Sequence, residues 1–122
     1  MGYEFARRLE LKTAILENKS GKFIVPNEQT TTDALTGVEL PQNLRLFVPD
    51  PTAADAYPIV TFSWVLLYTN YDDARKGDTL RNLIGWCLQD GQTYSPQLGY
   101  VRLTPEITSK ALAALNTINA GQ

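Results

Sequence analysis

A nearly unbroken apolar run at residues 57–68, YPIVTFSWVLLY, restricts the possible folds of this chain more than any other feature. The run is rich in β-branched and aromatic residues, which favour strands, and Pro58 stands at its entrance, where a missing N–H does least harm. Such continuous hydrophobicity is typical of a strand that is covered on both faces. It is far too short to span a bilayer, so we expect a strand of a soluble α/β domain.

Helical patterns follow this run. One apolar stripe predicts a helix with Asp78 as its N-cap and an end at residues 90–91, and it consists of Leu80, Leu83, Ile84, Cys87 and Leu88. The sequence Thr104-Pro105-Glu106 is typical of a helix start, with a cap, a proline in the first turn and an acid near the positive end. The buried face of this last helix is expected to comprise Ile107, Ala111, Ala114, Leu115 and Ile118.

The part of the chain before the run predicts shorter elements. A strand or a continued helix is expected at residues 11–16, and a helix within residues 30–35 is expected to be capped by Asn27. The other expected elements are a short helix at 3–9, a turn at 18–22, an extended stretch at 23–25 that Pro26 ends, a strand or extended edge at 44–48, and a loop at 49–52.

Several kinds of chemistry are excluded by composition. The chain has one cysteine, Cys87, and no histidine, which rules out an internal disulfide, Ser–His and Cys–His nucleophile pairs, and imidazole metal sites. A formal net charge of −2 gives no basic face for nucleic acid. Adjacent Asp72 and Asp73 are interpreted as turn residues rather than as a hydrolase pair. We therefore expect no catalytic residue, no metal, no cofactor and no enzymatic activity.

The first residues, MGYE, lack the charged-then-apolar pattern of a signal peptide. Two interpretations follow. Either the protein is cytosolic, or the front of a longer protein is missing from this sequence.

Several stretches follow one another in a characteristic order. LKTAILENKSGKF at residues 11–23 precedes the run at 57–68, and then come LIGWCL at 83–88, DGQ at 90–92 and LGYVRLTPE at 98–106. This ordered set resembles the C-terminal third of the substrate-binding proteins of phosphate ABC transporters, most of all cyanobacterial forms. Members of that family carry a YPI strand, a LENKAGKF stretch and a W…GQ…LGY…LP series.

The resemblance implies a type II periplasmic-binding-protein fold, in which a hinge joins two α/β lobes with a ligand cleft between them. The chain would be the C-terminal portion of that fold and would cross between lobes near Tyr57 and Pro58. Residues 1–57 would be the end of the second lobe, and residues 58–122 would complete the first. The implied function is capture of inorganic phosphate in the periplasm for an ABC-type importer, with the transporter permease as partner.

Ligand contacts are a different matter. In the family, the residues that hold phosphate precede everything seen in this chain, and the family's Ser-Gly-Thr loop with its nearby Arg has no counterpart here. The resemblance therefore transfers no phosphate contact to any residue. Thr61 and Ser63, near the expected hinge, are the only candidate positions, and we expect neither to bind.

A second hypothesis belongs to a different functional class. The chain would be a stand-alone structural or interaction module, derived from the same fold, with no ligand of its own. Its exposed lobe surfaces would then need cover, most simply from a homo-oligomer or from strand exchange.

Overall fold

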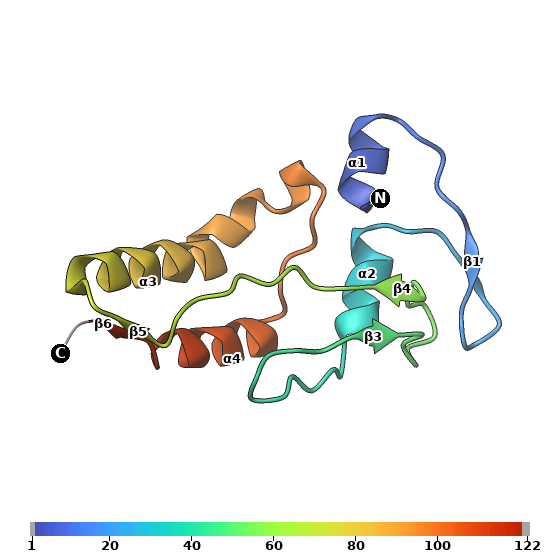
Figure 1. The fold of residues 1–122 in the computed structure, drawn as a ribbon. Coiled ribbons are helices and arrows are strands. Elements are labelled where there is room, and N and C mark those ends of the chain that lie inside the picture. The colour runs from blue at the N-terminus through green and yellow to red at the C-terminus, as the bar shows by residue number, and fades with distance from the viewer. Residues whose placement is uncertain (1, 121–122) are drawn as a thin grey trace.

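A computed structural model describes residues 2–120, which form a mixed set of short helices and strands (Figure 1). The helices are α1 (Tyr3–Arg8), α2 (Glu28–Leu35), α3 (Ala74–Leu88) and α4 (Pro105–Leu115), with 3₁₀ helices η1 (Asp90–Tyr94) and η2 (Pro96–Leu98). The strands are β1 (Leu16–Glu17), β2 (Phe23–Ile24), β3 (Val48–Pro49), β4 (Ile59–Val60), β5 (Asn70–Tyr71) and β6 (Asn119–Ala120). This composition is compatible with the predicted α/β class. No described helix combines the length and the hydrophobicity needed to cross a membrane.

The strands form three separate pairs. β1 pairs antiparallel with β2, β3 pairs antiparallel with β4, and β5 pairs parallel with β6. In the first pair Leu16 lies opposite Ile24, so Pro26 stands where the ladder would have to continue. Proline has no N–H to donate. Of residues 11–16, for which the sequence predicts a strand or a continued helix, only Leu16 lies in a strand, and β1 continues to Glu17.

The most prominent strand predicted from the sequence is mostly absent. Only Ile59 and Val60 are in a strand, and residues 61–69 run without regular structure from β4 to β5 (Figure 1). The expectation of a strand covered on both faces is therefore wrong for this structure. The physical reason is that a strand needs neighbours for its main-chain groups, and no other described segment pairs with residues 61–68.

Two helix starts match the sequence expectations. The Asn27 side chain accepts the N–H of Thr30, and the Thr30 hydroxyl accepts the N–H of Asn27, which is a capping box at the start of α2. At α4, the Thr104 hydroxyl accepts the N–H of Ile107, and Pro105 occupies the first helical position. Both predicted caps are confirmed.

Replacing Thr104 with alanine should lower the free energy of unfolding by about 1 kcal/mol, because an N–H in the first turn of α4 loses its acceptor. Urea unfolding followed by circular dichroism measures the change. Thr104→Ser is the matched control, since serine keeps a hydroxyl and should stay near the parent value. Equal losses in both variants would contradict a capping role.

The start of α3 differs from the prediction. Its N-cap is Asp73, whose carboxylate accepts the N–H groups of Arg75 and Lys76, and Asp78 lies inside the helix. The apolar stripe begins only at Leu80, so the first turns of α3 gave no hydrophobic signal from which the sequence could place its start. The stripe is half-buried rather than buried, and Leu83 is exposed.

A small core brings α2, β3 and the start of α4 together. Its buried members are Leu35 of α2, Val48 of β3 and Ile107 of α4. Partly buried side chains surround them, namely Val38, Leu40, Leu46, Val60, Phe62 and Leu103. The first turn of α4 is therefore held against α2 and β3, while the rest of α4 packs along α3.

Candidate functional site

Residues 61–69, called the free segment below, are the most unusual surface of this chain. Leu66 is 93% exposed, Tyr68 78% and Val65 67%, although all three are large and apolar or aromatic. Among the described residues, none provides a hydrogen-bond acceptor for the main-chain N–H groups of residues 61–67. An extended stretch with open backbone groups is a ready template for pairing with another strand.

The free segment is anchored at both ends. At its start, β4 is paired with β3. At its end, the carbonyl of Thr69 accepts the N–H of Asn119 at 2.8 Å, and the Asn119 side chain donates to Oδ1 of Asn70 at 3.0 Å. Figure 1 shows the stretch crossing the molecule between these two fixed ends. Fixed ends lower the conformational entropy that the stretch would lose on pairing.

A side-chain contact holds the middle of the free segment. The indole N–H of Trp64 donates to the carbonyl of Leu44 at 3.0 Å, and the Trp64 ring lies 5.6 Å from that of Phe47. The backbone of Leu44 has a φ of 56°, in the left-handed region that bulky residues rarely adopt. The indole therefore fixes the carbonyl of a strained turn.

The structure places both candidate ligand positions on the free segment. Thr61 and Ser63 are exposed, and the Thr61 hydroxyl donates at 3.5 Å to the carbonyl of Phe62. No Arg or Lys contact is found for either hydroxyl within residues 2–120. They contribute polar groups to a surface that is mostly apolar.

Just before the free segment, residues 54–57 are tied to the β1–β2 hairpin and to α2. The Asn18 side chain donates to the carbonyls of Ala54 at 2.9 Å and Ala56 at 3.1 Å. Tyr57 donates its N–H to the carbonyl of Thr30 and its hydroxyl to that of Ala14. Hydrogen bonds thus fix the chain up to residue 57. It then pairs with β3 over the two residues of β4, and the free segment follows.

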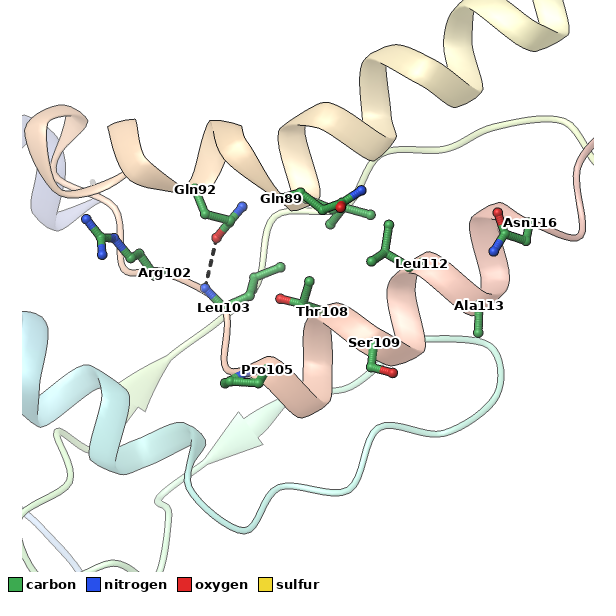
Figure 2. A pocket seen from close by; sticks show the side chains of 11 residues that line it. Gln89, Gln92, Arg102, Leu103, Pro105, Thr108, Ser109, Leu112, Ala113 and Asn116 are labelled. Carbon is green, nitrogen blue, oxygen red and sulfur yellow. Dashed lines mark hydrogen bonds between the residues drawn. The ribbon is translucent and has the colours of Figure 1, made fainter.

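An open groove of about 630 Å³ lies between the end of α3 and α4 (Figure 2). Gln92 bridges its two sides, because its amide N–H donates to the carbonyl of Cys87 and its Oε1 accepts the N–H of Leu103. Figure 2 shows the Arg102 side chain directed away from Thr108 and Leu112. The groove therefore lacks the inward-pointing cation that an anion site would use.

Side chains of the chain itself cap the starts of three helices. The Asn27 and Thr104 side chains accept N–H groups at the starts of α2 and α4, and the Asp73 carboxylate caps α3. Residues 2–120 contain no group of three or more Asp, Glu or Cys side chains that could hold a metal ion.

Two structurally important side chains had no signal in the sequence. The Asn18 side chain donates to carbonyls 36 and 38 residues away, and the Gln92 side chain accepts an N–H 11 residues away. Asn18 was expected only as a turn residue, which it also is, since its Oδ1 accepts the N–H groups of Ser20 and Lys22. Local patterns reveal the turn but not its distant partners.

Comparison with known proteins gives one consistent group of relatives. The chain is 29% identical over 135 aligned residues to the phosphate-binding protein PstS of Methanocaldococcus jannaschii, an alignment that covers 93% of this chain and 33% of the relative. It is 22% identical to the protein of that name from Pasteurella multocida and 21% identical to that from Xylella fastidiosa, over 94% and 87% of this chain. The chain spans about a third of the length of these relatives. It matches no protein-family model.

Proposed function

We propose that this chain is the C-terminal part of a periplasmic phosphate-binding protein that serves an ABC-type phosphate importer and its permease. In this proposal the whole protein binds inorganic phosphate and catalyses no reaction. The chain itself supplies scaffold to a two-lobed fold, with residues 1–57 ending the second lobe and residues 58–122 completing the first. Phosphate is held by segments other than this one.

The observation that carries the proposal is the similarity to phosphate-binding proteins along nearly the whole chain but along only a third of each relative. The free segment supports it. An exposed apolar stretch without main-chain partners is expected where a sheet lacks its other strands. The helix starts support the scaffold role, because side chains of the chain itself accept N–H groups in the first turns of α2, α3 and α4.

A chimera tests this proposal. Residues 1–122 would replace the aligned stretch of the Methanocaldococcus jannaschii protein, and phosphate would be titrated by calorimetry into the chimera, the parent protein and this chain alone. We expect the chimera to bind within about tenfold of the parent, a difference of about 1.4 kcal/mol, and the chain alone to show no binding. Sulfate is the control for a nonspecific anion effect.

Two results would contradict the proposal. A chimera that unfolds cooperatively but does not bind phosphate would show that the chain is not an equivalent scaffold. Micromolar or tighter phosphate binding by the chain alone would show that it carries the ligand contacts itself, with Thr61 and Ser63 as the first positions to substitute.

A further inference from the structure

We infer that α1 is a latch, a short helix that closes on the turn at Gly99 and opens while the rest of the fold stays intact. The latch connects residues 1–57 with residues 58–122, so its role in the whole protein rests on the proposed function. Its opening in this chain does not depend on phosphate. The inference starts from a contact between two main chains, where α1 lies beside the end of η2 (Figure 1).

Gly99 allows this contact because it has no side chain. A Cβ atom added at Gly99 would lie 2.7 Å from both Cα and Cβ of Glu4, whereas non-bonded carbon atoms pack about 3.5–4.0 Å apart. The φ of Gly99 is 81°, a left-handed conformation that residues with side chains rarely adopt. The turn is held in place, since the N–H of Gly99 donates to Pro96 and that of Tyr100 donates to Ser95. The helix therefore packs against a fixed surface that only glycine provides.

Few other interactions hold α1. Among the described residues, the hydrogen bonds of residues 3–11 all stay within residues 2–11, and Ala6 is the only buried residue of the helix. A cation–π contact, Arg8 over the ring of Phe5, also lies inside the helix. Residues 9–13, which follow α1, are exposed and lie outside helices and strands. Segments with few buried contacts open locally, so α1 can leave Gly99 without breaking hydrogen bonds elsewhere in the fold.

Trypsin measures the opening, because Arg7 and Arg8 lie in the last turn of α1 and are cut when the helix is released. Gly99→Ala should accelerate cleavage after Arg8 by about tenfold or more, since the added methyl group displaces α1. Cleavage after Arg81, inside α3, reports opening of the whole fold and should change by less than about threefold. Mass spectrometry of the products assigns each cut.

Gly37→Ala is the matched control. Gly37 has a φ of 74°, so alanine is strained there as it is at Gly99, but an added Cβ would meet no atom within 4 Å. This variant should leave cleavage after Arg8 within about threefold of the unaltered chain. Ala6→Gln is a second test that leaves the Gly99 turn unchanged. It enlarges the buried side of α1 and should accelerate cleavage after Arg8 as Gly99→Ala does.

Three results would overturn the inference. Equal acceleration by Gly99→Ala and Gly37→Ala would assign the effect to backbone strain. Equal acceleration after Arg8 and Arg81 would mean that α1 opens only with the whole fold. Unchanged cleavage in both Gly99→Ala and Ala6→Gln would mean that the contact does not hold α1.

Phosphate tests the connection between the two parts of the chain. In the proposed fold, α1 and Gly99 belong to different lobes, so a ligand that fixes the lobes relative to each other should also shift the latch. Saturating phosphate should change cleavage after Arg8 in the chimera by about threefold or more, and Gly99→Ala should remove this dependence. An unchanged rate in a chimera that binds phosphate would overturn the latch between lobes. A chimera that does not bind phosphate contradicts the proposed function instead, and the result for the chain alone is unaffected.

Discussion

Replacing Asn18 with alanine is expected to lower the free energy of unfolding by about 3 kcal/mol, since a buried group left without its hydrogen bond costs about 1–3 kcal/mol. Asn18 is only 5% exposed and makes four hydrogen bonds, two as donor to Ala54 and Ala56 and two as acceptor from Ser20 and Lys22. The variant loses all four. Urea unfolding followed by circular dichroism gives the difference.

Lys22→Ala is the control for the same hairpin. The Lys22 ammonium forms an ion pair with Asp55 at 2.8 Å, but both side chains are more than half exposed. Such a pair contributes little in water, so we expect a loss of less than about 1 kcal/mol. If the two variants were equally destabilised, the hairpin would be held to residues 54–56 by charge rather than by the buried amide.

The second large effect is expected at Ile107. Ile107→Ala should lower the free energy of unfolding by about 3 kcal/mol, within the range of about 2–5 kcal/mol for large-to-alanine changes in a core. Ile107 is buried against Leu35 and Val48, so the cavity opens where α4 meets α2 and β3. Denaturant unfolding measures this loss.

Ile15→Ala is a control with identical chemistry, since Ile15 is exposed and lies outside regular structure. It should change stability by no more than about 0.5 kcal/mol. A large effect at Ile15 together with a small one at Ile107 would mean that the core has been assigned to the wrong place.

The features that the sequence predicts correctly are those decided by neighbours in the chain. The predicted caps at Asn27 and Thr104 each accept an N–H three residues further on, and both are present. The turn at residues 18–22 is equally local. Each of these depends on side chains that reach their own backbone, so a short stretch of sequence contains all the necessary groups.

The features that the sequence predicts wrongly depend on distant partners. Residues 61–68 have the composition of a covered strand. Composition indicates a preference for the strand conformation, but it does not show whether partner strands are present. β1 begins only at Leu16, and Pro26, two residues beyond β2, could not donate an N–H to a longer ladder. The prediction of the start of α3 is wrong for another reason. The first turns after Ala74 carry no large apolar side chain, so the apolar stripe begins after the helix does.

The candidate site also depends on distant partners that the sequence does not reveal. The expected lack of ligand contacts for Thr61 and Ser63 rested on a resemblance and remains a prediction. Their exposure on an extended stretch could not be read from the sequence, because it results from the absence of a paired strand.

The parallel pairing of β5 with β6 has a consequence for how the chain is made. Asn70 and its partner Asn119 are 49 residues apart, so β5 cannot pair until the ribosome has synthesised β6. At about 5–20 residues per second, the ribosome needs roughly 2 to 10 seconds to deliver β6 after β5. Throughout that interval the C-terminal end of the apolar stretch before β5 is not yet anchored by β6. We therefore expect the nascent chain to be a chaperone client during those seconds.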